Sequence, residues 1–384
     1  MPDELHLVIN GDLHERLIEL TGGAAALCYQ CGTCTASCPW GLVREDHLPV
    51  RKIIHQAQLG VPGWEANLWQ CTTCGQCEVL CPRGVKITDV FRGLRELAWE
   101  ERRVEKGLPS LLWSIYWNEN PWSQPPSTRD VWAKGLEMPA FDPEQHETLL
   151  YVGCTSSFDR RAQKVARALV KVLNAAGVKF GYLGIDEPCC GESALSVGHL
   201  PYFNEIAQKT IKVFHDKGVR QLMTISPHCY DTFKNHYQDA GFESFHYTQF
   251  LAQLIANGRL KLSNEMKEKI TFQDPCYLGR HNNEYEAPRA ILAAIPGAHV
   301  IEMPRNKSEG LCCGGGGGRM WLETVNADRF SNLRATEASE TGAGILATAC
   351  PFCIVCLEDS VKSLNLSKLH VMDIAEVVAL ALEK

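Results

Sequence analysis

The sequence predicts an α/β protein with an N-terminal all-α domain, followed by two duplicated α/β subdomains that are rich in cysteine. Short apolar runs alternate with helical segments from residue 148 onward, which is typical of small parallel sheets covered by helices. The cysteines of this half recur with an offset of roughly 123 residues. The first hundred residues instead combine helical segments with two runs of closely spaced cysteines.

A chain of 384 residues suggests two or three domains. We expect a helical domain, a tryptophan-rich linker and two cysteine-rich subdomains, over residues 1–104, 105–147, 148–260 and 261–384. The net charge is −7 and there is no basic stripe, which makes nucleic acid an improbable partner.

Cysteine is the compositional outlier, with 18 residues that fall mostly in short-spaced groups. Such spacing is typical of metal sites in a reducing compartment rather than of disulfides. The segment Met1–Asn10 carries acidic residues and no apolar core, so no signal peptide is expected. No apolar run approaches the ~20 residues that span a membrane. We therefore expect a cytoplasmic protein, peripheral to a membrane complex at most, in an anaerobic organism.

Two cysteine runs of one spacing, C-x2-C-x2-C-x3-C-P, lie in the N-terminal domain. This spacing binds cubane [4Fe–4S] clusters in bacterial ferredoxins, and the fourth cysteine of each run ligates the other cluster. The first cluster is therefore assigned to Cys28, Cys31, Cys34 and Cys81, and the second to Cys71, Cys74, Cys77 and Cys38. Zinc sites do not use this run.

Three helices are expected around these runs, over Asp12–Leu20, Pro49–Gln58 and Val90–Glu101. The arrangement resembles the helical ferredoxin domain of the small heterodisulfide reductase subunit and of succinate dehydrogenase iron–sulfur subunits. The resemblance implies that the two clusters conduct electrons without contacting a substrate.

The linker contains four tryptophans, and Pro109 marks an expected break in the chain. The plain interpretation is a strap packed on the next domain. A docking surface for another subunit is the alternative, because tryptophan is enriched at interfaces. The four residues are Trp113, Trp117, Trp122 and Trp132.

The two cysteine-rich copies align residue by residue: Cys154 with Cys276, Cys189-Cys190 with Cys312-Cys313, and Cys229 with Cys353. In the first copy we expect strands over Leu149–Val152, Val178–Leu183 and Leu222–Ile225, and helices over Ala162–Ala176 and Ile206–Phe214. In the second we expect a helix over Ala287–Ala294 and strands over His299–Met303 and Ile345–Ala347. The cysteines follow strand ends, where parallel sheets place their sites.

The second copy holds a complete set of five motif cysteines, Cys276, Cys312, Cys313, Cys350 and Cys353, and Cys356 is additional. Five glycines follow the cysteine pair, Gly314 to Gly318, whose backbone N–H groups can approach a sulfide-rich cluster. This segment resembles the CCG motif of the catalytic heterodisulfide reductase subunit, and the whole chain resembles the fused iron–sulfur subunit of heterodisulfide reductases and DsrK-type proteins. The resemblance implies a noncubane [4Fe–4S] cluster at which a disulfide is reduced. A structural zinc site is the alternative.

The first copy has Ser226 where the motif has a cysteine, which leaves Cys154, Cys189, Cys190 and Cys229. Serine is a poorer iron ligand because its hydroxyl is harder to deprotonate. Four thiols suffice for a further iron–sulfur cluster or for zinc, and an empty site is the third possibility.

Several residues beside these motifs have two interpretations. Cys356 is either a buried thiol or a sulfur that exchanges with substrate. His281, and less readily His228, could donate a proton to a leaving thiolate. Arg280 and Arg319 could hold an anionic substrate or pair with local carboxylates.

Two functions follow from the sequence. In the first, electrons pass through the cubanes to the second CCG motif, where a small disulfide or another sulfur substrate is reduced. In the second, the chain is an electron-transfer subunit without its own substrate, which links a flavoprotein to a membrane cytochrome, a quinone-reactive subunit or another reductase. No flavin or nicotinamide fingerprint is present, so either function requires partner subunits.

Overall fold

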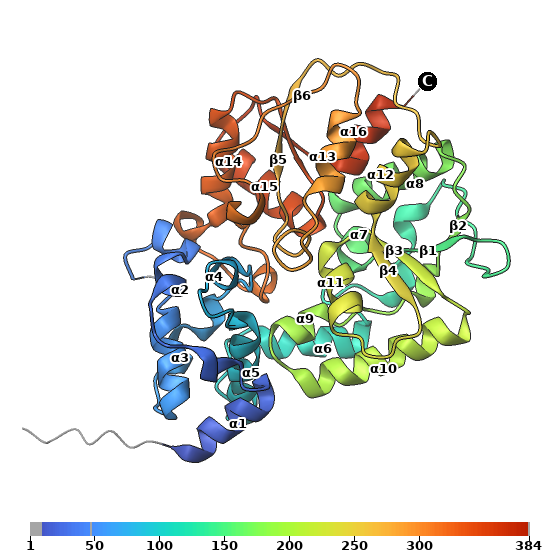
Figure 1. Cartoon of the computed structure of the whole chain (residues 1–384). Helices are drawn as coiled ribbons and strands as arrows, with labels where there is room; N and C mark the ends of the chain where they lie inside the picture. Colours follow the sequence, from blue (N-terminus) through green and yellow to red (C-terminus); the bar gives the residue numbers. More distant parts are fainter. Residues whose placement is uncertain (1–9, 47, 383–384) are drawn as a thin grey trace, which may run out of the picture.

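The computed structural model describes residues 10–46 and 48–382. Figure 1 shows the N-terminal helices on one side of the molecule and two parallel sheets with their helices making up the rest. Residues 1–9, on which the expectation about a signal peptide rests, lie outside the described residues.

Helices and 3-10 turns form the N-terminal part, and the three helices expected from the sequence are present as α1, α3 and α5. The Asn10 side chain caps the start of α1, and Gly60 in the left-handed region ends α3. The elements are α1 (Gly11–Thr21), η1 (Ala24–Leu27), α2 (Thr33–Ala36), η2 (Pro39–Leu42), α3 (Val50–Leu59), η3 (Trp64–Gln70), α4 (Gln76–Val79) and α5 (Ile87–Glu100).

The linker differs from its prediction at Pro109, which begins a helix instead of breaking one. Proline fits the first turn of a helix, where its missing N–H has no partner to lose. The elements here are α6 (Leu108–Asn118), η4 (Pro126–Thr128) and η5 (Val131–Ala133). Trp132 is buried as a packed strap requires, whereas Trp113 and Trp117 are exposed. A docking role for the exposed tryptophans stays a prediction.

The first repeat is a parallel sheet of order β2-β1-β3-β4 with helices around it. Its strands are β1 (Thr148–Tyr151), β2 (Phe180–Gly181), β3 (Gln221–Thr224) and β4 (Glu243–His246). Its helices are α7 (Cys154–Phe158), α8 (Ala162–Ala175), η6 (Gly184–Asp186), α9 (Glu192–Ser196), α10 (Leu200–Asp216), α11 (Pro227–Asn235) and α12 (Tyr247–Ala256). Compared with the prediction, β2 is shorter and α10 begins earlier.

The second repeat has the equivalent order β6-β5-β7-β8, also parallel, so the predicted duplication is confirmed. Its strands are β5 (Lys269–Gln273), β6 (His299–Val300), β7 (Ile345–Thr348) and β8 (His370–Asp373). Its helices are α13 (Glu286–Ala293), η7 (Lys307–Glu309), η8 (Arg319–Trp321), η9 (Asn326–Asp328), α14 (Phe330–Glu340), α15 (Pro351–Ser363) and α16 (Ile374–Ala381). The strand β6 ends before the predicted Met303.

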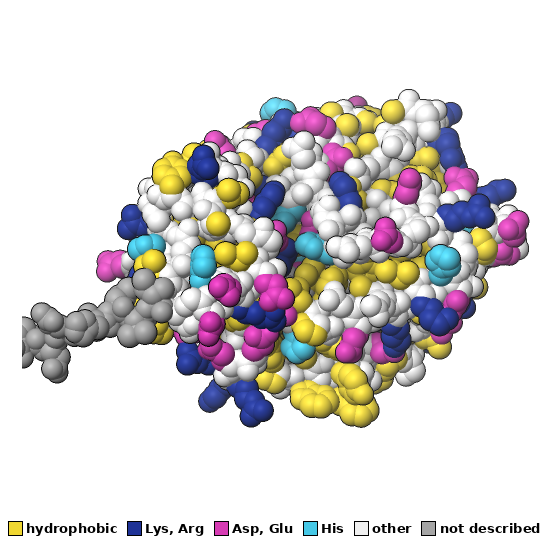
Figure 2. Space-filling view, turned by 60° about the horizontal axis from the view of Figure 1, so that its bottom comes forward, with side chains coloured by type: hydrophobic (Ala, Val, Ile, Leu, Met, Phe, Trp, Pro, Cys, Tyr) yellow, Lys and Arg dark blue, Asp and Glu magenta, His cyan; other side chains and the backbone are white. Residues whose placement is uncertain are grey.

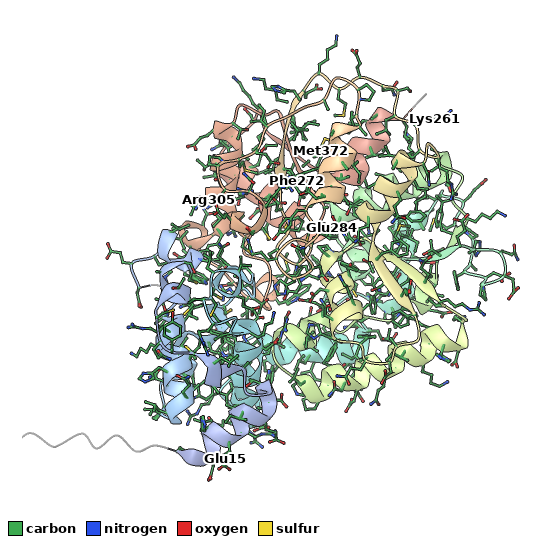
Figure 3. The ribbon with its side chains drawn as sticks, in the orientation of Figure 1. Glu15, Lys261, Phe272, Glu284, Arg305 and Met372 are labelled. Carbon is green, nitrogen blue, oxygen red and sulfur yellow. The ribbon has the colours of Figure 1, made fainter. Side chains whose placement is uncertain are left out.

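The two repeats share one apolar core, to which Leu150 of the first repeat and Phe272 of the second both belong. Phe272 is labelled in Figure 3. Glu284 accepts a hydrogen bond from Gln249 of α12 across their junction. A second core joins the N-terminal helices to the second repeat through Tyr277 and Phe330. The three parts are therefore packed as one body around the cysteine loops.

On the face in Figure 2, basic and acidic side chains are intermixed. Among the described residues, no helix has the length and apolar character needed to cross a membrane.

Asp373 makes a contribution to the stability of the fold that depends on pH. It caps α16 by accepting from the Ala375 N–H at 2.9 Å, and it accepts from the Tyr247 hydroxyl at 2.5 Å. Burial raises its pKa to about 8, although these hydrogen bonds oppose the rise. Its Oδ2 is buried and has no hydrogen-bond partner among the described residues, so this oxygen can carry the proton.

We expect Asp373→Asn to gain stability relative to the wild type as the pH rises from 5 to 8. The unfolded carboxyl titrates near 4, so between there and the folded pKa the native state holds a proton that the unfolded state releases. The wild type then loses up to about 1.4 kcal/mol per pH unit, while the neutral amide keeps the cap and does not titrate. Thermal unfolding of both proteins across this range measures the difference. Parallel stability curves would contradict the buried, protonated carboxyl.

Candidate metal centre

The fourth cysteine of each N-terminal run lies near the cysteines of the other run. Cys38 lines one small cavity together with Cys71, Cys74 and Cys77. Tyr29 lies beside both Cys31 and Cys81, which places the fourth cysteine of the second run with the first run. Each group contains one buried cysteine, Cys34 in the first and Cys74 in the second, and the first group also contains the exposed Cys31.

The second repeat gathers its five cysteines at the carboxyl ends of two neighbouring strands. Cys276 follows β5, and Cys350 and Cys353 follow β7 at the start of α15. Sγ of Cys313 lies 3.4 Å from Sγ of Cys353, and the Cys276 and Cys312 thiols are within hydrogen-bond reach of each other. All five are buried. Adjacent parallel strands thus bring together residues up to 77 positions apart in the sequence.

Two of these thiols are disposed to ionise. A hydrogen bond from Cys276 lowers the pKa of Cys312. Burial would raise the pKa of Cys350, but hydrogen bonds from Cys353 and His228 lower it to about 5. Because the thiolate is the form that binds metal, these two residues are prepared as ligands. The zinc alternative for these five cysteines stays open.

The cysteine loops of the second repeat lie directly on the second N-terminal group. The Cys74 thiol is within hydrogen-bond reach of the Cys312 thiol. The Tyr277 hydroxyl lies 2.7 Å from Oγ1 of Thr73. A Cβ at Gly316 would stand 2.4 Å from the Thr72 carbonyl oxygen, and one at Gly317 would stand 2.3 Å from that of Cys71. Only glycine permits this approach.

Arg280 occupies the junction between these two cysteine groups. Its Nε donates to the Cys74 carbonyl at 2.6 Å, and its Nη1 donates to the carbonyls of Ser308 and Gly310 at 3.2 and 2.6 Å. Its Nη2 is buried without a partner among the described residues, beside Cys74, Cys276 and Cys312. Among the described residues Arg280 forms no ion pair with a carboxylate, and its binding of an anionic substrate stays a prediction. A buried guanidinium with one unpaired nitrogen among cysteine sulfurs fits an anionic metal–sulfur group at this place.

The first repeat forms a comparable but smaller set. Sγ of Cys190 lies 3.3 Å from Sγ of Cys229, and Cys154 and Cys189 are within hydrogen-bond reach of each other. Nη2 of Arg129 lies 3.5 Å from Sγ of Cys154. Ser226 lines the same small cavity and caps α11 by accepting from the His228 N–H. Four thiols with a buried cation fit an iron–sulfur group, and no observation decides between it and zinc.

The two histidines singled out from the sequence lie on either side of Tyr277. The His281 ring is stacked on it at 4.3 Å between centroids, and its Nε2 bonds the Thr73 carbonyl at 2.8 Å. His281 thus holds the N-terminal loop, and proton donation from it stays a prediction. The His228 ring lies 4.0 Å from Tyr277 and contacts Cys350 of the other repeat.

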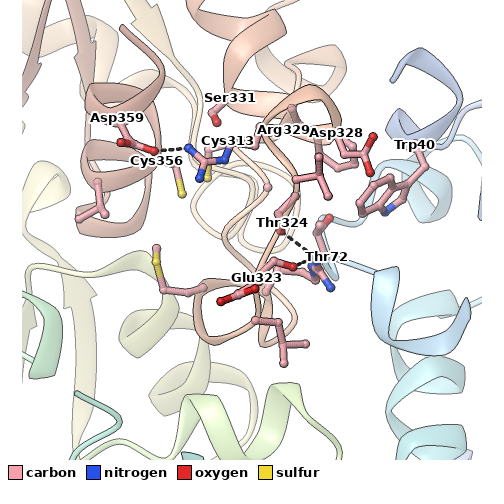
Figure 4. A pocket seen from close by; sticks show the side chains of 17 residues that line it. Trp40, Thr72, Cys313, Glu323, Thr324, Asp328, Arg329, Ser331, Cys356 and Asp359 are labelled. Atoms are coloured by element: carbon pink, nitrogen blue, oxygen red, sulfur yellow. Dashed lines mark hydrogen bonds and ion pairs between the residues drawn. The ribbon is translucent and has the colours of Figure 1, made fainter. Parts of the chain in front are cut away.

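A cavity of about 830 Å³ opens beside the second-repeat cysteines (Figure 4). Cys313 and Cys356 lie in its wall, together with Trp40 and Thr72 of the N-terminal part. Cys356 is therefore half-exposed to this cavity, which departs from the expectation of a buried thiol.

Arg319 also lines the cavity, and among the described residues it forms no ion pair with a carboxylate. Its Nη2 donates to the Glu323 carbonyl at 3.0 Å and to the Thr324 hydroxyl at 2.6 Å. Arg329, by contrast, forms an ion pair with Asp359. A guanidinium held by neutral oxygens retains donors for an anionic ligand.

Sequence reasoning missed several residues of this region. Arg129, Glu187, Glu192 and Tyr277 are buried around the cysteines. Tyr277 directly follows Cys276 in the sequence, and this position could have indicated that it lies at the site. The others lie in unremarkable sequence, and only the fold reveals their proximity.

Comparisons with known proteins agree with this organisation. The cysteine-rich domain family, CCG, matches residues 148–234 and 270–358, and the 4Fe-4S dicluster domain family matches residues 24–85. The chain is 37% identical over 327 residues to a probable iron-sulfur-binding oxidoreductase, FadF, of Bacillus subtilis, covering 82% of this chain and 46% of the relative.

Two further relatives are informative. EtfAB:quinone oxidoreductase of Syntrophomonas wolfei is 37% identical over 83% of this chain and 47% of its own length. A subunit of the dihydromethanophenazine:CoB–CoM heterodisulfide reductase of Methanosarcina barkeri is 33% identical over 81% of this chain and 77% of its own length. The chain spans about half the length of FadF and of the quinone oxidoreductase.

Proposed function

The chain belongs to the iron–sulfur protein family that joins a 4Fe-4S dicluster domain to two CCG domains and that includes a heterodisulfide reductase subunit. On this premise we propose that the chain is the electron-carrying subunit of a multisubunit redox complex. Electrons pass through two cubane clusters to a noncubane cluster in the second CCG domain. A disulfide or related sulfur substrate is reduced there.

The observation that carries this proposal is the contact between Cys74 and Cys312. These residues belong to the second cubane group and to the second CCG motif, so their clusters would be neighbours. Arg280 lies between them and offsets the negative charge of both. An electron leaving the second cubane therefore has a short path to the noncubane centre.

Electron entry is proposed at the first cubane. Cys31 is the exposed member of its group, and Leu27, Tyr29 and Leu42 near it are exposed apolar side chains. Apolar residues that remain solvent-exposed are suited to a transient partner. That partner would be a flavoprotein or a membrane cytochrome or quinone-reactive subunit.

The cavity beside Cys313 is the proposed substrate site. Arg319 would bind an anionic group of the substrate, and the apolar wall of Met320, Leu322 and Phe330 would exclude water from the sulfur atoms. The bound cluster would supply two electrons one at a time, and two protons complete the conversion of one disulfide into two thiols. The Cys356 thiol lies in the same wall and would contact the substrate sulfur.

A second function is favoured by Ser226 and by the quinone oxidoreductase relative. In it the chain passes electrons between partner subunits and binds no disulfide. The cavity would then have no sulfur substrate, and the two functions differ in an assay that supplies electrons artificially.

We expect Arg319→Gln to raise the KM for an anionic disulfide by about tenfold to a hundredfold, because a charge-assisted hydrogen bond contributes about 1.5–3 kcal/mol. The probes are 3,3′-dithiodipropionate and the neutral bis(2-hydroxyethyl) disulfide, with reduced methyl viologen as electron donor. The KM for the neutral disulfide should change little. Arg305→Gln is the control, since Arg305 pairs with Glu337 and does not line the cavity.

Equal changes in the KM for the two disulfides would contradict the proposed role of Arg319 in substrate recognition. A fully loaded wild-type protein that reduces neither disulfide, yet passes electrons to a quinone analogue, would favour the electron-transfer function.

A further inference from the structure

Two equivalent positions of the repeats meet across the junction between them. His228 stands two residues after Ser226 at the start of α11, and Phe352 stands two residues after Cys350 at the start of α15. The two rings are 4.5 Å apart between centroids. Each repeat thus extends one side chain toward the cysteines of the other.

The His228 ring is held in place by Glu192 and Tyr277. Its Nδ1 lies 3.1 Å from Oε1 of Glu192, and Oε1 also accepts from the Ser196 hydroxyl at 2.5 Å. Tyr277 of the second repeat stacks on the ring face at 4.0 Å and 25°. The side chain is 4% exposed, so it has no solvent-facing alternative.

The ring is within hydrogen-bond reach of Cys350, which belongs to the second repeat. Because Nδ1 is engaged by Glu192, Nε2 is the nitrogen left to donate to this sulfur. In the opposite direction, Phe352 lines the cavity around the first-repeat cysteines and offers them no donor. His228 of the first repeat can therefore donate a hydrogen bond to a second-repeat cysteine, whereas Phe352 of the second repeat donates none to the first-repeat cysteines.

We propose that the first repeat completes the metal centre of the second: His228, oriented by Glu192, is a positioning residue whose hydrogen bond to Cys350 sets the reduction potential of the second-repeat cluster. The inference rests on the proposed function in that it requires a cluster at Cys350. It gives the first repeat a role that does not depend on what its own four cysteines bind.

The direction of the effect follows from charge. A donor to a cluster thiolate withdraws negative charge from the sulfur and favours the reduced cluster, which carries one more negative charge. The hydrogen bond therefore raises the reduction potential of the second-repeat cluster. Such a cluster draws electrons from the neighbouring cubane and holds them for the substrate.

The test compares His228→Phe with His228→Gln in the full chain, loaded and purified anaerobically. Phenylalanine copies the residue at the equivalent position 352, so it preserves an aromatic contact while removing the donor. Glutamine keeps an N–H donor. The midpoint potential of each cluster is read by EPR-monitored redox titration, and iron is counted in parallel.

At the wild-type midpoint of the second-repeat cluster, we expect His228→Phe to lower the ratio of reduced to oxidised cluster about tenfold, which corresponds to 59 mV for one electron. His228→Gln should restore most of the ratio of reduced to oxidised cluster. The midpoint potentials of both cubane clusters should be unchanged in the two variants. Loss of the cluster in the phenylalanine variant alone would also support the donor role.

An unchanged midpoint in His228→Phe would overturn the inference, as would equal loss of the cluster in both variants, because packing would then explain the effect. A wild-type protein without a second-repeat cluster signal would instead contradict the proposed function. The two failures are therefore distinguished within one experiment.

Discussion

Replacing Cys353 by serine is expected to remove about four iron atoms per chain and to reduce disulfide turnover to background, while both cubane clusters remain. Cys353 is 2% exposed and lies 3.4 Å from Cys313 on the side of α15, whereas contact with the N-terminal group is made by Cys312. A serine hydroxyl cannot replace the thiolate at neutral pH, and the noncubane cluster proposed for the second repeat uses all five thiols, unlike a cluster that four thiols can hold. Iron analysis and EPR spectra of the reduced protein measure the loss.

Cys356→Ser is the matched control for this substitution. It changes a thiol on the same helix one turn later, in a residue that no proposed ligand set contains. This variant should keep its iron. An iron loss that is equal in the two variants, or a Cys353→Ser protein with the full iron count, would contradict the proposed ligand set.

Replacing Arg95 by leucine is expected to produce the largest loss of stability, about 3–5 kcal/mol. Arg95 is fully buried, and its two terminal nitrogens donate to four carbonyls in three segments. These are the carbonyls of Ser196 and Gly317, at 2.5 and 3.1 Å, and of Leu68 and Cys71, at 3.2 and 2.7 Å. The substitution leaves four buried acceptors without this donor and separates the N-terminal loop from both repeats.

Chemical unfolding under anaerobic conditions measures this effect. Arg103→Leu serves as the control, because Arg103 is 57% exposed at its side chain and pairs with Glu65 at the surface. Little change is expected there. An Arg95→Leu protein as stable as this control would show that the three parts are held together mainly by apolar packing.

The sequence allowed the repeat architecture and the grouping of cysteines to be predicted because both depend on local patterns. Alternating apolar runs predict strands, and cysteine spacing predicts which thiols share a loop. Strand lengths were less predictable: β2 and β6 are two residues each, because pairing with β1 and β5 determines where they end.

The remaining features depend on contacts between distant segments. The sequence left open whether Arg280 binds an anionic substrate or pairs with a carboxylate, and it did not indicate the three backbone carbonyls to which Arg280 donates in the fold. Pro109 looked like a break because proline stops helices more often than it starts them. The pairing of His228 with Cys350 requires both repeats to be placed, and no spacing within either repeat indicates it.

Iron, zinc and acid-labile sulfide per chain, measured on the full-length protein purified anaerobically, test the central claim most directly. The account predicts about 12 iron atoms for two cubanes and a second-repeat cluster, and about 16 if the first repeat also binds one. One zinc with about 12 iron would assign zinc to the first repeat. A count near 8 iron would contradict the claim, because the five cysteines beside Arg280 would then hold no cluster.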